Sequence, residues 1–588
     1  MKTKIINKIL LILFLCGINI VVFAAPAYNQ LIVFKQSDKT ELSLFLKGDE
    51  KVNWAKTTDG YTLLQNKTGD FVYAIYDDKG GIVPSTLIAH NQDKRNKEEL
   101  ELLKSINKEL FFSSDQINTL KQLWDFKQTP EYLQSYNQAK TSQRDLRIIV
   151  LLVGYPDRPF VNNAQYFDDL FNQVGYNFNG NEGSVKDYFL ASTFGNVNVS
   201  ADVYGPYISS ASAAAYGSQV PDGAKSLLTE VINLADSEIN FANYCGNGSQ
   251  FVDAVYMIYA GCAASSGEPD AIWPHRSALY PPVQKDGVYI FNYGCSAELN
   301  GSTASGKTPP VIGTICHEFS HVLGLDDVYD TDYGDSGGES PASYNWDVMS
   351  QGCYNNGART PSLWSAFQRN SEGFLDLVEL STTTTGIGNK TLPPLHLSNI
   401  AYKLTHSPTE YFVFENRQQI GWDRFIPGHG MIITHIDKAV PGWNSNCANC
   451  DPSWMGIDIK EANPSNSWNN SGNPFPGTTN NTSFTDSSNP NSNSNSGSPL
   501  NRPITRIKEN TTTKNISFDF GAISPNAPKA ITNGITRLTS DSIYVSVSVF
   551  QTSDPIIEKG IVYSTSITHY LQIQKLLIQN PLLTLLQL

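Results

Sequence analysis

Cysteine is scarce in this chain, and it is absent where an N-terminal regulatory segment would need it. The 588 residues include eight cysteines, and none of them lies between Ala25 and Val153. This gap excludes every mechanism that requires a thiol from that stretch. Cys447 and Cys450 are the only close pair, and a small loop disulfide is the better prediction for them, because one CxxC without a second pair is weak evidence for structural zinc.

Positive charge is also in short supply. The chain has 42 Lys and Arg against 56 Asp and Glu, a net charge of −14, which argues against a general nucleic-acid binder, since that class needs a net basic face. Hydrophobic residues make up 40% and charged residues 17%, a balance that argues against global disorder and coiled coil. Since single cores stop growing near ~250–300 residues, several domains are expected.

Apolar runs long enough to span a bilayer are missing. The run from Ile9 to Phe23 falls short of the ~20 residues that a membrane-spanning helix needs. Three lysines precede it and Val-Phe-Ala follows, so residues 1–24 are predicted to be a signal peptide cleaved before Ala25. The mature chain would be exported without a transmembrane anchor, and its seven remaining cysteines would leave at least one free thiol.

The composition changes along the chain and predicts a multidomain α+β protein. Residues 25–143 are mixed and charged and suggest no chemistry, whereas 144–380 alternate strand and helix patterns, an α/β layout. Residues 381–522 are β-patterned and contain an Asn/Ser-rich stretch, 463–501, that indicates a surface loop or linker. A fibronectin III-like β segment at 523–566 is too short for a sandwich of ~100 residues, so we expect it to be incomplete through truncation or a frameshift, with an irregular tail at 567–588.

Four patterns in the α/β region predict specific elements. The run LRIIVLLVGY at 146–155 predicts a strand buried on both faces. Residues 184–195 predict a short helix with Ser184 as N-cap, Asp187 completing the cap and Gly195 as the stop. Alternation at 197–203 and the run at 251–260 predict two further strands.

The chemistry is concentrated in PPVIGTICHEFSHVLGLDDVYD at 309–330. On a helix, His317 and His321 lie four residues apart on one face and can bind one cation, while Glu318 lies beside the open position of the metal. The helix is expected to begin at the two prolines and to end at Gly324. The bare HExxH pattern should occur in roughly 1% of shuffled chains, and the Gly and Asp that follow lower this about a hundredfold, so accident is a poor explanation.

A third ligand is expected after the turn at Gly324. Asp327, ten residues after His317, is the candidate, and Asp326, Asp330 and Glu339 are alternatives that remain open. Two imidazoles and a carboxylate leave a fourth position for water. Zinc fits this ligand set, although manganese and iron also accept it.

With these motifs the sequence resembles the metzincins, and more closely the M6 family of immune inhibitor A-type secreted bacterial metallopeptidases. The resemblance rests on HExxHxxGxxD at 317–327 and WDVMS at 346–350, and it extends through GSVKDYFLASTFG, VDAVYMIYAG, IWPH, EYFVFENRQQIGWD and GHGMIITHID. It implies a metzincin-like protease domain with zinc on His317, His321 and Asp327, Glu318 as general base and Met349 as an apolar floor.

The same resemblance suggests roles for other residues. Tyr354 is a candidate for stabilising the oxyanion, at an offset from Met349 that differs from the usual one. His275 in IWPH could line the cleft, but a packed histidine is the better prediction. Calcium, which family members often bind before the VDAVY-like strand, lacks a supporting motif, because residues 243–250 contain no carboxylate.

Residues 25–143 resemble the inhibitory prosegment of a zymogen. The missing cysteines exclude a cysteine switch, so we expect a carboxylate or the new α-amino group of Ala25 to fill the open metal position. Cleavage is expected near Lys140 to Arg144. The predicted function is therefore a secreted or surface-located zinc endopeptidase that acts on extracellular proteins and is inhibited by its own propeptide, with no nucleic-acid partner.

Two other functional classes compete with this prediction. An exported adhesin with a degenerate protease domain is the alternative, against which the retained Glu318 argues. A metal-dependent hydrolase of another substrate is the third, but no phosphate cradle or paired-carboxylate sugar site replaces the peptidase pattern.

Overall fold

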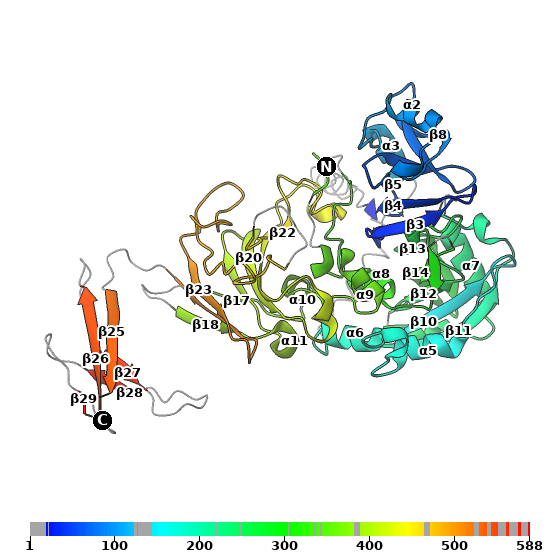
Figure 1. Ribbon diagram of the computed structural model, residues 1–588. Helices are drawn as coiled ribbons and strands as arrows, with labels where there is room; N and C mark the ends of the chain where they lie inside the picture. The colour runs from blue at the N-terminus through cyan, green and yellow to red at the C-terminus, as the bar shows by residue number, and fades with distance from the viewer. Residues whose placement is uncertain are drawn as a thin grey trace, which may run out of the picture.

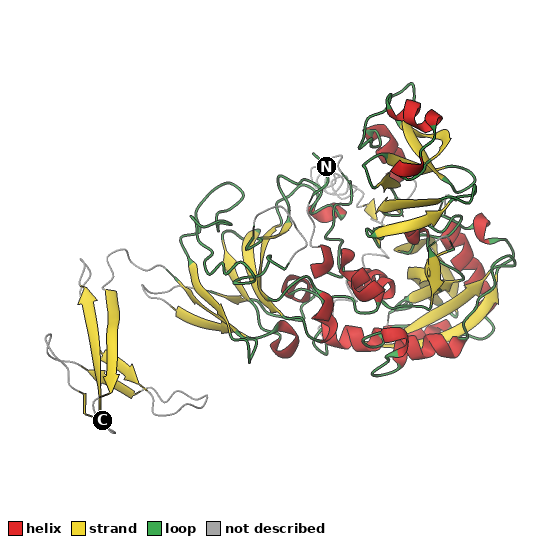
Figure 2. Cartoon of the chain, in the orientation of Figure 1, coloured by secondary structure: helices red, strands yellow, loops and turns green. Residues whose placement is uncertain are grey.

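The computed structural model describes residues 19–20, 23–122, 126–127, 144–218, 220, 222–246, 249–303, 305–333, 337–340, 344–380, 388–463, 471–521, 529–537, 542–550, 560–563, 574–577 and 586–587 (Figure 1). It is a mixed α/β structure with several separate sheets. The α-helices lie in the first two thirds of the chain, and after α11 (Leu395–Ser398) the described residues form strands, loops and two short 3-10 helices (Figure 2). No described helix has both the length and the apolar character needed to cross a bilayer.

The N-terminal region is an antiparallel six-stranded sheet in which each strand pairs with the next along the chain. Its strands are β3 (Leu31–Lys35), β4 (Glu41–Gly48), β5 (Asn53–Thr57), β6 (Thr62–Gln65), β7 (Phe71–Tyr76) and β8 (Ile82–Ile88). Alternate residues of β4 are buried, as one packed face requires. Two helices follow, α2 (Lys97–Leu103), which Asn96 and Glu99 close with a capping box, and α3 (Ser114–Gln122).

The central sheet has the strand order β11-β10-β12-β14-β13-β2. Strand β10 (Arg144–Gly154) pairs in parallel with β11 (Val197–Ile208) and β12 (Val255–Tyr259), and β14 (Val288–Ala297) is parallel to β12. Strand β13 (His275–Lys285) runs antiparallel to β14, and the short β2 (Phe23–Ala24) adds to β13 in antiparallel register. The N-terminal residues thus extend the sheet of the α/β region.

Helices cover both faces of this sheet. Ile148, Val150 and Leu152 of β10 pack in one core with α5 (Ala164–Asn172), α6 (Val185–Ser192) and α8 (Gly313–Leu323). Ile149, Leu151 and Val153 pack in a second core with α7 (Gly223–Ala235). The prediction of a strand buried on both faces is therefore confirmed.

Local signals placed the other predicted elements well. Ser184 and Asp187 form a capping box at the start of α6, and β11 begins at Val197, as the alternation predicted. The strand predicted over 251–260 is shorter, because β12 covers Val255–Tyr259 and Phe251 makes only an isolated bridge to Tyr289. Helix α8 begins at Gly313 rather than at the prolines, with Ile312 at its N-cap.

The β-rich region consists of two sheets. One has the order β17-β19-β20-β21-β22 and the other the order β18-β24-β23. Their strands are β17 (Val378–Glu379), β19 (Tyr402–Thr405), β20 (Glu410–Arg417), β21 (Gly430–Asp437), β22 (Ile457–Ile459), β18 (Gly388–Leu392), β24 (Ile516–Phe520) and β23 (Ile504–Glu509).

Residues 471–501, the described main part of the Asn/Ser-rich stretch, pack onto these sheets through buried side chains. Phe475 and Phe484 are fully buried in the same core as Phe412 and Ile433. Two aromatic anchors in a polar background leave no periodic pattern, so the composition alone suggested a loop or linker.

Short elements complete the described chain: β1 (Asn19–Ile20) paired with β9 (Phe126–Lys127), β15 (Asn300–Ser302) paired with β16 (Gly306–Thr308), α9 (Asn355–Ala358) and α10 (Ala366–Ser371). Near the C-terminus, β25 (Lys529–Arg537), β26 (Ser542–Phe550) and β29 (Leu586–Gln587) form one sheet, and β27 (Gly560–Tyr563) pairs with β28 (Gln574–Leu577). β28 and β29 fall in the stretch expected to be an irregular tail. The prediction of an irregular tail missed these two short strands. Hydrogen bonding between strand backbones does not require apolar and polar side chains to alternate along the sequence.

Candidate metal centre

Helix α8 carries His317 and His321 on one side, with their rings in contact. The ring centroids are 4.8 Å apart and the two Nε2 atoms are 3.1 Å apart. The helix packs so closely that a Cβ on Gly313 would lie 1.9 Å from the carbonyl oxygen of Cys353. It ends at Gly324, whose φ of +117° is a left-handed conformation that glycine adopts without strain.

Backbone carbonyls orient both imidazoles. Nδ1 of His317 lies 2.7 Å from the carbonyl oxygen of Val348, and Nδ1 of His321 lies 2.7 Å from that of Leu325. Because a carbonyl only accepts, each Nδ1 carries the proton and each Nε2 presents its lone pair to the shared space. This carbonyl support is the usual outer contact of a metal-binding histidine.

Asp327 supplies the third candidate donor atom, its carboxylate Oδ1. Its Oδ1 lies 3.4 Å from Nε2 of His317 and 3.2 Å from Nε2 of His321, and these three residues form a group able to bind one metal ion. A tetrahedral Zn²⁺ with bonds of about 2.0–2.1 Å needs ligand atoms about 3.3 Å apart. The observed spacing of the donor atoms fits that requirement.

The three alternative carboxylates lie elsewhere. Asp330 accepts the backbone N–H groups of Tyr333 and Ser340, and Glu339 forms an ion pair with Lys47 at 3.3 Å. Asp326 is exposed. The geometry therefore favours Asp327.

The electrostatics of the centre suit a cation. Burial lowers the pKa of His321, which keeps the ring neutral and able to bind a metal. Burial alone would raise the pKa of Asp327, but attraction to His321 overcomes this and holds it below the usual value. The ionised carboxylate of Asp327 thus places a buried negative charge at the site, which a metal ion would neutralise.

Glu318 is completely buried next to these ligands. Its Oε1 accepts the backbone N–H of Ala25 at 2.7 Å, and its Oε2 has no hydrogen-bond donor among the described residues. Burial raises the pKa of this carboxyl well above its usual value. A raised pKa of this kind favours the exchange of protons by a carboxyl group, the property that a general acid or base needs.

Met349 lies in a tight turn that also supports the histidines. Its side chain is fully buried in the core with Ile315 and Phe319 of α8. Its N–H donates to Oδ1 of Asp347 at 2.8 Å, and its carbonyl accepts the N–H of Val328 at 3.1 Å. The turn thus ties the segment after Asp327 to the carbonyl that orients His317.

Residues 25–28, here called the N-terminal strip, continue from β2 across this site. Three side chains of the α/β region donate to three successive carbonyls of the strip: Trp273 to Ala25 at 2.9 Å, Tyr354 to Pro26 at 2.7 Å and Gln351 to Ala27 at 3.0 Å. The strip therefore covers the general-base candidate with an extended backbone. Neither Trp273 nor Gln351 was singled out from the sequence, where no spacing distinguishes them.

Tyr354 and His275, the two residues predicted for the oxyanion or the cleft, both form hydrogen bonds within the protein. The hydroxyl of Tyr354 is engaged by the strip, as just described. His275 is buried, with Nδ1 2.7 Å from the carbonyl oxygen of Trp273 and Nε2 2.8 Å from the hydroxyl of Tyr293, and burial lowers its pKa to about 4. This is the packed histidine that the sequence favoured over a cleft residue.

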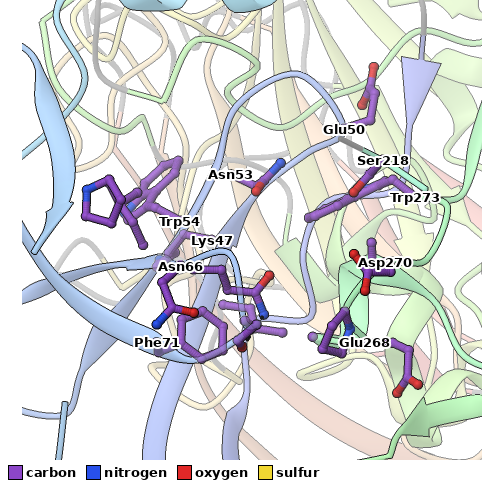
Figure 3. Close-up of a pocket in the computed structure, with 18 of the residues that line it drawn as sticks. Lys47, Glu50, Asn53, Trp54, Asn66, Phe71, Ser218, Glu268, Asp270 and Trp273 are labelled. Carbon is purple, nitrogen blue, oxygen red and sulfur yellow. Dashed lines mark hydrogen bonds between the residues drawn. The ribbon is translucent and has the colours of Figure 1, made fainter. Parts of the chain in front are cut away.

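A cavity of about 640 Å³ separates the N-terminal sheet from the α/β region. Figure 3 shows Glu50 at one end of it, with Trp273 and Ser218 on the α/β side. Glu50 lies in the turn between β4 and β5 and is 3% exposed, and burial raises its pKa well above the usual value. It lies near enough to Glu318 and Asp327 for its charge to act on both.

One carboxylate lies beside the loop where members of the resembled family often bind calcium, a site for which the sequence shows no motif. In the described part of that loop, Oδ1 of Asp253 accepts the N–H of Gly246 at 2.9 Å. Burial raises the pKa of Asp253 to about 6. Asp253 lies just after residues 243–250, the stretch that contains no carboxylate.

The sequence is similar to that of known metallopeptidases. Residues 134–377 match the family model described as immune inhibitor A peptidase M6, catalytic domain. The pre-pro-metalloprotease PrtV of Vibrio cholerae serotype O1 is 28% identical over 280 residues, which cover 39% of this chain and 29% of that protein. Immune inhibitor A of Bacillus thuringiensis subsp. alesti is 28% identical over 254 residues, 35% of this chain and 36% of that protein. The chain spans about a third of the length of these curated relatives.

Proposed function

We propose that this chain, whose residues 134–377 match the immune inhibitor A peptidase M6 catalytic-domain model, is a secreted zinc endopeptidase of the metzincin type that cleaves extracellular proteins. The observation that carries the proposal is the convergence of three donor atoms at tetrahedral spacing, with Glu318 on the same helix. The proposed units are a signal peptide, 1–24, a propeptide, 25–143, a catalytic domain, 144–380, and β-rich segments after it.

The proposed chemistry assigns one task to each residue. His317, His321 and Asp327 would hold Zn²⁺, which supplies a Lewis acid that polarises a carbonyl and lowers the pKa of a water. Glu318 would accept the proton of that water and pass it to the leaving amine. Met349 would form an apolar floor beneath these ligands and would take no part in the proton transfer.

Hydrolysis of casein by the processed protein tests this function. We expect activity that 1,10-phenanthroline abolishes and zinc restores. Glu318→Ala should lower kcat by about 10²–10⁴-fold, the usual contribution of a general base, while zinc remains bound. Glu238→Ala, at an exposed site outside the centre, is the matched control and should behave as wild type. Wild-type protein that binds zinc but cleaves nothing would favour an exported adhesin with a degenerate protease domain.

The proposal includes latency, for which the chain offers two groups. If the signal peptide is removed before Ala25, the nitrogen now 2.7 Å from Glu318 becomes an α-amino group beside the metal site. The other group is the buried carboxylate of Glu50. Both belong to the segment whose removal would expose Glu318, so the propeptide would act as the inhibitor.

Proteolytic release of the propeptide is the corresponding test. The expected cleavage region, near Lys140 to Arg144, falls largely outside the described residues, and Arg144 is the first residue of β10. Cleavage there should switch the activity on. Full activity of the uncleaved protein would contradict latency without affecting the assignment of the metal ligands.

A further inference from the structure

Asp327 is held by a residue from the β-rich region, 119 positions away in sequence. The side-chain oxygen of Asn446 accepts the backbone N–H of Asp327 at 2.7 Å, and its Nδ2 donates to Oδ2 of Asp327 at 2.7 Å. The two side chains are 4% and 2% exposed. One amide thus engages both the backbone and the carboxylate of the proposed third ligand.

This contact determines which carboxylate oxygen faces the histidines. Oδ2 accepts from Asn446, whereas Oδ1 has no hydrogen-bond donor in the described part of the chain and lies toward the two Nε2 atoms. The reversed amide would place its carbonyl against the carboxylate, so the hydrogen-bond pattern admits one orientation. Asn446 therefore prevents rotation of the carboxyl group.

Asn446 can do this because its own backbone is held in place. It adopts a left-handed conformation, φ 54° and ψ 36°, after the 3-10 turn Trp443–Ser445, and asparagine tolerates that conformation better than most residues. Its carbonyl accepts the hydroxyl of Thr331 at 2.5 Å. The loop and the segment after Asp327 therefore touch at both the side chain and the main chain.

The predicted disulfide begins at the residue immediately after Asn446. Cys447 and Cys450 are bonded, and Asn449 between them is fully buried. Nδ2 of Asn449 donates to the carbonyls of Val328, at 2.8 Å, and Ile457, at 2.9 Å. Residues 446–450, Asn-Cys-Ala-Asn-Cys, thus contact Asp327 and Val328 through their two asparagines, with a covalent ring closing the loop.

We propose that Asn446 is a positioning residue for Asp327, and that the loop 446–450 of the β-rich region completes the metal centre of the α/β region. The inference rests on the proposed metal site and goes beyond it. Groups that orient ligating carboxylates typically contribute 10–100-fold to metal affinity. The β-rich region is then part of the catalytic apparatus, not a separate binding module.

Zinc affinity of the full chain tests the inference without relying on activity. In competition with a chromophoric chelator, Asn446→Ala should bind zinc 10–100-fold more weakly than wild type, and the visible spectrum of the Co²⁺-loaded protein should change. Asn416→Ala is the matched control, because this buried amide in the same region donates to the carbonyls of Leu392 and Lys514, away from the metal. It should reduce stability but leave zinc affinity unchanged.

The outcomes separate the two proposals. His321→Ala should lose zinc binding altogether, and a wild-type chain that binds no zinc would overturn the proposed function. If wild type binds zinc and a folded Asn446→Ala binds it equally well, the positioning role is wrong while the metal site stands. Equal losses in Asn446→Ala and Asn416→Ala would also overturn it, since that result indicates general destabilisation.

Discussion

Two segments far apart in sequence reach the proposed metal centre, and different kinds of contact bind each of them there. The N-terminal strip is bound through its backbone carbonyls, which Trp273, Tyr354 and Gln351 contact. The loop 446–450 is bound through asparagine side chains and closed by a disulfide. Backbone contacts can be made by any extended peptide, whereas the amide contacts are specific to this loop. This difference agrees with the proposal that the strip is a removable inhibitor and the loop a lasting part of the site.

The largest expected effect comes from altering the strip. Processed at Ala25 but still carrying its propeptide, the chain should be nearly inactive, and one extra residue before Ala25 should raise its activity by 10-fold or more, because the displaced amino group no longer sits beside Glu318. Glu50→Gln separates the two latency groups. An active Glu50→Gln zymogen, together with no effect of the added residue, would assign latency to the carboxylate. The measurement is the initial rate on a quenched peptide.

A smaller effect is expected from opening the disulfide. The double variant Cys447→Ser, Cys450→Ser keeps Asn446 but frees its loop, so zinc affinity should fall by up to about tenfold, less than in Asn446→Ala. Chelator competition measures it. The single variant Cys262→Ser, at a buried free cysteine, controls for loss of a sulfur atom, and a larger loss there than in the double variant would contradict the role of the loop.

A still smaller effect is expected at one contact of the strip. Trp273→Phe removes the N–H that donates to Ala25 but retains an aromatic ring. A hydrogen bond contributes about 1 kcal/mol, so the residual activity of the zymogen should rise about fivefold. Trp454→Phe, whose Nε1 donates to Asp437 in the β-rich region, is the control. No change in the Trp273 variant would show that this hydrogen bond does not hold the strip.

The smallest effect is expected inside the N-terminal sheet region. Hydrogen bonds from Arg95 lower the pKa of Asp59 to about 2, so the pair stabilises the fold above about pH 4 and loses this contribution as the pH falls through 2. Asp59→Asn should cost about 1 kcal/mol at pH 7, with little difference from wild type at pH 2. Thermal unfolding of the full chain at several pH values measures this. A pH-independent difference would contradict the ion pair.

Local patterns in the sequence were sufficient for the elements that depend on neighbours along the chain. The capping box of α6 and the buried strand β10 are of this kind, because hydrogen bonding and side-chain period act over a few residues. His317 and His321 are also local, since four residues on a helix bring them together. Asp327 was one of four candidates, because the loop after Gly324 has no fixed period.

The sequence by itself predicted the two histidines and the adjacent Glu318 as parts of a metal centre, and its cysteine-free N-terminal region excluded a thiol switch from that segment. Only the tertiary structure brought Asp327 beside the two histidines as the favoured candidate, placed Ala25 against Glu318 and brought Asn446 to Asp327 from 119 residues away. The physical reason is that contacts between distant segments depend on how sheets and loops pack against one another. No spacing along the chain records that packing.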